Sequence, residues 1–267
     1  MKLNIVPAGT GIQWVKLGIR TFMKQPLALT TLTFMYMAAG AIFVATQSAV
    51  GALGAFMIVP AATLGFMAAT REALDGRFPT LRVFLSAFRA GRARLLSMIV
   101  LGLLYTGCCV LVTLLVRMTI DLPALPADFD GRSQPPPEFV AGFMQRLLLG
   151  TLLYVPVSIM FWHAPALVHW HAVSPVKSIF FSTVACVRNY KPMLLYNLAW
   201  MGIMVMAFVV MMVLMAVTGR PELVAGILIS LTPIGASVFF TSMYFTFRDS
   251  FVADEASPEQ PPPGEPT

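Results

Sequence analysis

The hydrophobic positions of this chain gather into six long stretches separated by short polar segments. The stretches cover residues 27–46, 51–70, 95–116, 147–168, 193–217 and 223–247, and none contains Asp, Glu, Lys or Arg. Because a helix needs about 20 largely apolar residues to cross a bilayer, all six are long enough to do so. The pattern predicts an all-α polytopic membrane protein with six transmembrane helices.

Amphipathic segments precede the first, third and fifth stretches, near residues 12–26, 80–94 and 174–192. Apolar residues at helical spacing form one stripe in each: Ile12, Val15, Ile19, Phe22 and Met23 in the first, Leu81, Phe84, Leu85 and Phe88 in the second, and Val176, Ile179, Phe180, Thr183, Val184 and Val187 in the third. Such spacing is typical of amphipathic helices. We expect these segments to be interfacial helices that lie in the plane of the cytoplasmic membrane surface.

An early proline recurs in each returning stretch and is followed six residues later by an aromatic residue. The prolines are Pro60, Pro156 and Pro233, and the aromatic residues are Phe66, Trp162 and Phe239. An internal proline removes a backbone hydrogen bond and can kink a helix. One proline per membrane helix is common, but three at one register favour three repeats of an interfacial helix plus a hairpin. Three hairpins entering from one side are parallel repeats, unlike the inverted pair of many secondary transporters.

The basic residues indicate how the chain is oriented. Of the 18 lysines and arginines, only Arg117, Arg132, Arg146 and Arg220 fall on the side opposite the termini. Cytoplasmic loops carry the excess of Lys and Arg, so both termini should be cytoplasmic. We expect a transmembrane domain over residues 1–250, an irregular outer loop over 121–141, and a disordered cytoplasmic tail over 251–267, because that tail is acidic and rich in proline.

A cluster of arginines lies just before the third stretch. Arg89, Arg92 and Arg94 admit two interpretations. They anchor the chain by the ordinary excess of positive charge in cytoplasmic loops, or they form a site for anionic lipid headgroups. The same basic residues could in principle contact nucleic acid, but they flank membrane spans, and membrane topology explains them better.

Composition leaves little room for catalysis. Charged residues make up 11% of the chain, against about 25% in soluble domains, so no separate catalytic domain is expected. No hydrolase, phosphate-loop or zinc-protease motif is present.

His163 is the one ionisable side chain near the interior of a stretch, and such residues are functional candidates by default. It could equally donate to a carbonyl group freed by a nearby proline. The histidines in FWHAPALVHWH lack the further ligands of a metal site, so we expect neither metal nor cofactor.

Two segments resemble a known family. FWHAPALVHWHAVSPVKSIFFSTVACVRNYKP, Phe161 to Pro192, and WVKLGIRTFMKQP, Trp14 to Pro26, are similar to an uncharacterised family of six-span proteobacterial inner-membrane proteins. The repeated pattern is more loosely similar to the membrane domain of bacterial glycerophosphodiester phosphodiesterases. That domain accompanies the enzyme and is not its catalytic part, so no activity carries over from it. The family resemblance implies a six-span protein of the bacterial inner membrane and supplies no substrate or catalytic residues.

Together these features predict a non-enzymatic integral protein of the bacterial inner membrane. It would act as a scaffold or lipid-associated assembly factor whose partners are membrane lipids, with anionic lipids the first candidates. The alternative is a transporter or permease for a small or amphipathic solute, built around a cavity between the kinked spans. The sequence leaves open a protein partner or a homo-oligomer.

Overall fold

The computed structural model describes residues 2–125, 129 and 134–252. The chain forms two compact units. The terminal unit comprises Met1–Thr30, Thr70–Phe78 and Ala185–Thr267, and the central unit comprises Thr31–Ala69 and Pro79–Val184.

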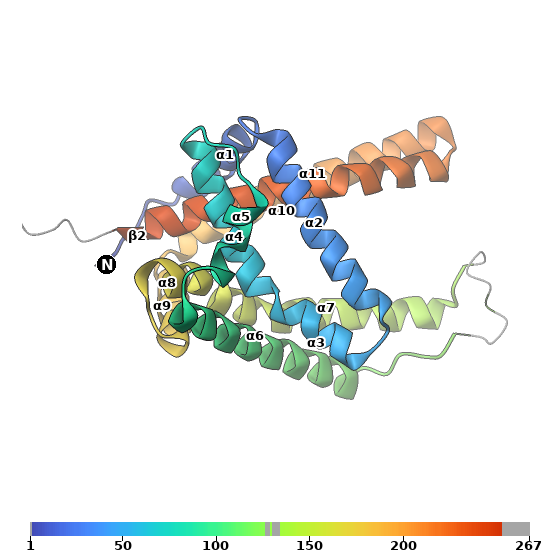
Figure 1. The fold of residues 1–267 in the computed structure, drawn as a ribbon. Coiled ribbons are helices and arrows are strands. Elements are labelled where there is room, and N and C mark those ends of the chain that lie inside the picture. Colours follow the sequence, from blue (N-terminus) through green and yellow to red (C-terminus); the bar gives the residue numbers. More distant parts are fainter. Residues whose placement is uncertain (1, 126–128, 130–133, 253–267) are drawn as a thin grey trace, which may run out of the picture. The chain divides into compact units, whose positions relative to one another are not determined.

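Helices account for nearly all of the described chain (Figure 1). In chain order they are α1 (Thr10–Phe22), α2 (Pro26–Ala45), α3 (Ala49–Met57), α4 (Val59–Leu74), α5 (Leu81–Phe84), the 3-10 helix η1 (Leu85–Phe88), α6 (Arg92–Thr119), α7 (Pro137–Phe161), α8 (Ala164–His171), α9 (Pro175–Arg188), α10 (Tyr190–Thr218) and α11 (Pro221–Ser250). Two short strands, β1 (Lys2–Leu3) and β2 (Phe251–Val252), pair in antiparallel fashion.

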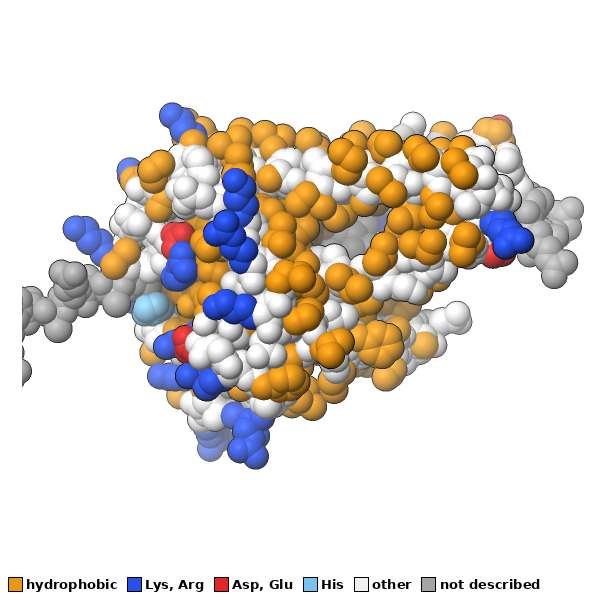
Figure 2. Space-filling model, turned by 90° about the horizontal axis from the view of Figure 1, so that it is seen from above, with side chains coloured by type: hydrophobic (Ala, Val, Ile, Leu, Met, Phe, Trp, Pro, Cys, Tyr) orange, Lys and Arg blue, Asp and Glu red, His pale blue; other side chains and the backbone are white. Residues whose placement is uncertain are grey.

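Six helical stretches are long and apolar enough to cross a membrane. They are α2, α3 with α4, α6, α7 with α8, α10, and α11. Their positions match the six apolar stretches of the sequence, and Figure 2 shows hydrophobic side chains over much of the visible surface. The structure thus confirms an all-α polytopic membrane protein with six spanning helices.

The fourth spanning helix begins earlier than hydropathy indicates. Helix α7 starts at Pro137 and includes Glu138 and Arg146 before its apolar part. Arg146 Nε donates to the carbonyl oxygen of Ile120, just beyond the end of α6, at 2.9 Å. The expected irregular loop over 121–141 was therefore too long at its C-terminal end, while its residues 126–128 and 130–133 lie outside the described part of the chain.

A serine from α9 marks the break between α7 and α8 in the central unit. Ser182 Oγ donates to the carbonyl oxygen of Ile159 at 2.9 Å and accepts the backbone N–H of His163 at 2.9 Å. An uninterrupted helix would pair those two backbone groups directly. Insertion of a side chain into this ladder is a recognised cause of helix kinks, and Pro165 removes a further backbone donor in the next turn.

Helix α1 packs against α10 and α11 through small residues. A Cβ atom on Gly18 would collide with Ser242, and one on Gly11 would collide with the carbonyl oxygen of Pro192. Trp14 lies between these glycines in the sequence and is fully buried. Small residues let helix backbones approach closely, and this kind of packing is what holds helices together in lipid.

Polar side chains tie the two ends of the chain together in the terminal unit. Trp14 Nε1 donates to Asp249 Oδ2 at 2.9 Å, and Asn4 Nδ2 donates to the carbonyl oxygen of Asp249 at 2.9 Å. The buried Asn189 donates through Nδ2 to the carbonyl oxygen of Asn4 at 2.9 Å and accepts the backbone N–H of Val6 at 3.0 Å. The N-terminal segment is thereby fixed to α11 and to the start of α10.

The ordered domain extends slightly beyond its expected end. Phe251 and Val252, which we assigned to the disordered tail, pair with Leu3 and Lys2. The boundary expected after residue 250 therefore lies two residues too early, because strand pairing continues past the end of α11. The rest of the expected tail, residues 253–267, lies outside the described residues.

One of the three expected interfacial helices is not a continuous helix. Helices α1 and α9 fill most of the segments 12–26 and 174–192, but 80–94 consists of the short helix α5, the turn η1 and the start of α6. Gly91, just before α6, has φ +90°, a conformation that glycine adopts easily and other residues rarely do. The apolar stripe of this segment therefore lies on two short turns.

The apolar stripe of α9 is not the face through which this helix packs against the rest of the protein. Val176, Phe180 and Val187 are 58–69% exposed, whereas Ser178 and Ser182 on the opposite side are fully buried. Lipid is as apolar as these side chains, so burying them in protein gains nothing. The small and hydroxylated residues make the contacts instead.

The apolar stripe of α1 is partly buried and partly exposed, for the same reason. Val15 and Phe22 are buried, but Ile12, Ile19 and Met23 are 42–67% exposed. The buried face of α1 is completed by glycine and threonine residues. Helix α1 is therefore a packed helix with a lipid-accessible apolar edge.

Each hairpin contains an edge-to-face aromatic pair between its two spans. The pairs are Tyr36–Phe66, Tyr105–Phe161 and Trp200–Phe239, with ring centroids 5.7, 5.1 and 5.3 Å apart and interplanar angles of 87°, 77° and 78°. Such pairs contribute about 0.5–1.5 kcal/mol beyond area burial. In the first and third pairs, one ring belongs to the aromatic residue expected six positions after the proline. In the second pair that place is taken by Phe161, the neighbour of the expected Trp162. The recurrence supports three copies of one hairpin unit.

We predict that Gly18→Val destabilises the protein, because the added side chain meets Ser242 with no room to move. Overpacking of this kind typically costs about 1–3 kcal/mol of unfolding free energy. Gly40→Val is the matched control, since a Cβ at Gly40 in α2 meets nothing within 4 Å. Thermal unfolding in detergent micelles measures both. Equal unfolding midpoints for the two variants would contradict the close packing of α1.

We predict that the Cys186 thiol is inert in the folded protein. Cys186 is buried in α9, and burial raises the pKa of its thiol to about 12. Because the raised pKa keeps the thiol neutral, its contribution to stability is present below pH 9 and is lost as pH rises through about 12. In a variant carrying Cys108→Ala and Cys109→Ala, a maleimide at pH 8 should label Cys186 only after denaturation. Rapid labelling of the folded variant would refute this prediction.

Candidate functional site

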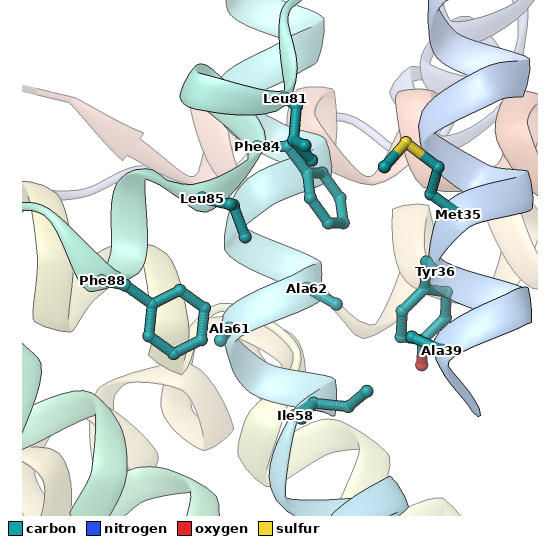
Figure 3. A pocket seen from close by; sticks show the side chains of 10 residues that line it. All are labelled: Met35, Tyr36, Ala39, Ile58, Ala61, Ala62, Leu81, Phe84, Leu85 and Phe88. Carbon is teal, nitrogen blue, oxygen red and sulfur yellow. The ribbon is translucent and has the colours of Figure 1, made fainter. Parts of the chain in front are cut away.

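An apolar pocket of about 240 Å³ lies in the central unit between α2, the α3–α4 junction and the segment Leu81–Phe88 (Figure 3). Its walls are Met35, Tyr36 and Ala39 from α2, Ile58, Ala61 and Ala62 from the junction, and Leu81, Phe84, Leu85 and Phe88 from α5 and η1. Figure 3 shows carbon atoms throughout these side chains, apart from the Met35 sulfur and the Tyr36 hydroxyl. The pocket therefore suits an apolar ligand.

The four residues of the predicted stripe in 80–94 are the four that line this pocket from one side. Phe84 alone is buried, and its ring meets that of Phe66 edge-to-face at 4.9 Å. A Cβ on Gly65 would collide with the carbonyl oxygen of Phe84, so the segment lies directly against α4. Leu81 and Phe88 remain 42% and 48% exposed. The stripe thus borders a hollow and is only partly covered by protein.

A second hollow of about 200 Å³ adjoins the first. Ile58, Ala61 and Phe88 line both. The remaining walls of the second hollow are Phe43, Gly54, Met57, Met98 and Ile99. These residues are all apolar, so the lining continues from one hollow to the other around the Phe88 ring.

Four arginines belong to the segment that borders the pocket. They are Arg82, Arg89, Arg92 and Arg94, and all four are exposed. Among the described residues, no carboxylate lies within ion-pair distance of any of them. Their charges are therefore available to an anionic ligand.

Arg77, a few residues earlier in the chain, behaves differently. Its Nε lies 2.5 Å from Glu72 Oε2, and its Nη2 lies 2.6 Å from Asp75 Oδ2. The hydrogen bond that Arg77 donates to the Glu72 carboxylate raises the pKa of the Arg77 guanidinium above its ordinary value. Because its charge is already matched, Arg77 serves as an internal comparison for the four arginines.

The start of α6 is unusually basic for a helix N-terminus. Arg92 and Arg94 lie in the first turn, no acidic residue is there, and Gly91 offers no side-chain cap. The helix dipole disfavours cations at this end by about 0.3–1 kcal/mol each, and it favours anions. The first turn of α2 has no charged residue, and that of α10 has only Lys191. Free backbone N–H groups and guanidinium groups together make this turn suited to a phosphate.

The intramembrane candidate His163 lies outside both hollows. It is fully buried at the α7–α8 break, where its backbone N–H is held by Ser182. His169 in α8 is also buried, and its Nδ1 has no hydrogen-bond partner among the described residues. Within the described part of the chain, no three His, Cys, Asp or Glu side chains lie close enough together to hold a metal ion.

The three prolines occupy different local structures. Pro60 is the second residue of α4 and follows the interruption at Ile58 that ends α3. Pro156 and Pro233 lie inside α7 and α11, which continue past them. A helix break therefore accompanies Pro60, and that break forms part of both hollows through Ile58.

Sequence patterns indicated the wall of the apolar pocket that the segment 80–94 forms, but they did not indicate the walls from α2 and the α3–α4 junction. The stripe and the arginines of 80–94 were visible from helical spacing and charge. Met35, Tyr36 and Ala62 lie within uniformly apolar spans, where nothing in the periodicity distinguishes a pocket wall from a lipid-facing surface.

Comparison with known proteins agrees with a membrane location. No family model matches the chain, and no solved structure matches it. A probable inner membrane protein of Burkholderia thailandensis is 30% identical over 272 residues, an alignment that covers 98% of each chain. The looser resemblance to the membrane domain of glycerophosphodiester phosphodiesterases gains no support from these comparisons and stays a prediction. With six spanning helices and this relative along its whole length, the chain belongs to the family of that probable inner membrane protein.

Proposed function

We propose that this protein is a non-enzymatic, lipid-associated protein of the bacterial inner membrane that acts as a scaffold or assembly factor. In this proposal Arg89, Arg92 and Arg94 bind the headgroups of anionic lipids. The observation that carries it is a cluster of exposed arginines without carboxylate partners among the described residues, on the same segment that borders an apolar pocket.

Lipid binding uses both properties of this segment. A guanidinium can form two parallel hydrogen bonds with a phosphate, and each basic residue near an anionic membrane surface contributes about 1 kcal/mol. The apolar stripe beside the arginines offers carbon surface where acyl chains run. A headgroup site at the cytoplasmic end of α6 would explain why cations occupy a helix end that disfavours them.

The proposal includes no enzymatic activity. Arginine stays protonated in proteins, so a cluster of arginines holds anions but does not act as a general acid or base. The buried His163 lines neither hollow, so a ligand held there would not contact it.

A transporter or permease for an amphipathic solute is the second candidate. The two apolar hollows favour it, because they could hold the apolar part of such a solute. Neither hollow is lined by a charged side chain that would couple transport to an ion. We therefore favour lipid association.

We also propose that both termini are cytoplasmic. The pairing of β1 with β2 supports the same side for both, since Leu3 lies opposite Phe251. The excess of Lys and Arg on that side favours the cytoplasm.

We predict that replacing Arg89, Arg92 and Arg94 together with Gln weakens the binding of anionic lipid. At about 1 kcal/mol for each arginine, the affinity of the detergent-solubilised protein for phosphatidylglycerol should fall roughly 100-fold at low ionic strength. Arg77→Gln is the matched control and should change affinity little, because Arg77 is already paired with Glu72 and Asp75. Native mass spectrometry of the detergent-solubilised protein with added phosphatidylglycerol gives the measurement. Equal lipid retention by the triple variant and the control would contradict the proposed headgroup site.

Reporter fusions test the orientation. Green fluorescent protein fused after Val252 should fluoresce, and alkaline phosphatase inserted after Pro123 should be active, because the first reporter works only in the cytoplasm and the second only outside it. The opposite pair of results would invert the proposed topology.

A further inference from the structure

We infer that the two hollows of the central unit bind the two acyl chains of a single phospholipid, with one chain on each side of Phe88. This inference rests on the proposed function, since the headgroup of that lipid is the one that the arginines bind. It adds the class of ligand: a diacyl phospholipid, as opposed to a single-chain lipid or another anion.

The shared wall is the first observation. Ile58, Ala61 and Phe88 line both hollows, so the two spaces lie on either side of one ridge. Phe88 is the last residue of η1 and is 48% exposed, so its ring is only half covered by protein. A ligand with two chains joined at one end would cover this ridge from both sides.

The size and chemistry of the hollows are the second observation. Their volumes are about 240 and 200 Å³, each below the roughly 300–1,000 Å³ of pockets that hold compact drug-sized ligands. Both are lined by aliphatic, aromatic and thioether side chains. Two separate apolar spaces of similar size match two hydrocarbon chains better than one bulky ring system.

The position of the charges is the third observation. Arg82 follows Leu81 and Arg89 follows Phe88, so basic residues flank both ends of the segment whose stripe lines the first hollow. Both arginines are exposed, and within the described chain neither has a carboxylate partner. A negatively charged group attached to chains in the hollows would find these guanidinium groups beside it.

Competition between lipids tests the inference on the full-length protein in detergent. Native mass spectrometry would compare dioleoyl phosphatidylglycerol, mono-oleoyl lysophosphatidylglycerol and dioleoyl phosphatidylcholine at equal concentrations. We expect the protein to prefer the diacyl over the monoacyl phosphatidylglycerol by roughly tenfold or more, because the second chain buries additional CH₂ groups. Equal retention of the two would overturn the inference.

Filling each hollow separately gives the sharper test. Ala62 lines only the first hollow and Ile99 only the second, so Ala62→Trp and Ile99→Trp should each bring retention of the diacyl lipid down to that of the monoacyl lipid. Val205→Trp is the matched control, because Val205 on α10 is 56% exposed and lines neither hollow. Ala62→Leu and Ile99→Phe provide smaller fillings if a tryptophan variant unfolds, and they should give a partial loss in the same direction.

The two sets of variants separate the two claims. Filling either hollow should leave the preference for phosphatidylglycerol over phosphatidylcholine intact, while the Arg89, Arg92 and Arg94 variant should lose that preference and keep the preference for two chains. An unchanged diacyl preference in both filled variants would overturn the inference, whatever the arginine variant does. An unchanged headgroup preference in the arginine variant would instead overturn the proposed headgroup site.

Discussion

The packing of this protein depends on the fact that lipid is no less apolar than leucine. Moving an apolar side chain from lipid into protein gains almost nothing, so helices associate through close backbone contacts and hydrogen bonds. Gly11 and Gly18 let α1 approach its neighbours. Ser182 from α9 holds the interrupted backbone at the end of α7. Asn189 fixes the N-terminal segment. Small and polar residues therefore make many of the contacts inside the protein, while many large apolar residues, such as Val176 and Phe180, remain exposed.

The segment over 80–94 is the exception that gives the protein its candidate site. Its apolar stripe is neither packed like a soluble core nor spread along one surface helix, because Gly91 and the 3-10 turn break the segment into short pieces. Phe84 inserts against Gly65, while Phe88 remains half exposed between two hollows. Arginines flank this partly covered carbon surface. An anionic phospholipid combines a charged headgroup with hydrocarbon chains, which is the combination that these arginines and this apolar surface suit.

Sequence reasoning predicted the helical elements well, but it did not predict which face of each helix packs against protein. The six spans followed from length and hydropathy, since a bilayer demands about 20 apolar residues whatever the neighbours are. The buried face of α9 did not follow, because periodicity locates an apolar stripe without saying whether protein or lipid covers it. Ser178 and Ser182 are small hydroxylated residues four positions apart, and that spacing indicates the buried face of α9. The wall of the pocket contributed by Tyr36 and Ala62 depends on tertiary structure and could not be read from the chain.

Lipid analysis of the protein extracted from its own membrane tests the central claim most directly. The protein would be purified in a polymer that retains surrounding lipid and then washed into detergent, and the lipids that remain bound would be identified by mass spectrometry. If the segment over 80–94 and its two hollows bind a phospholipid, the retained fraction should be enriched in anionic diacyl lipid relative to the bulk membrane. A retained fraction with the composition of the bulk membrane, or no retained lipid, would contradict the account.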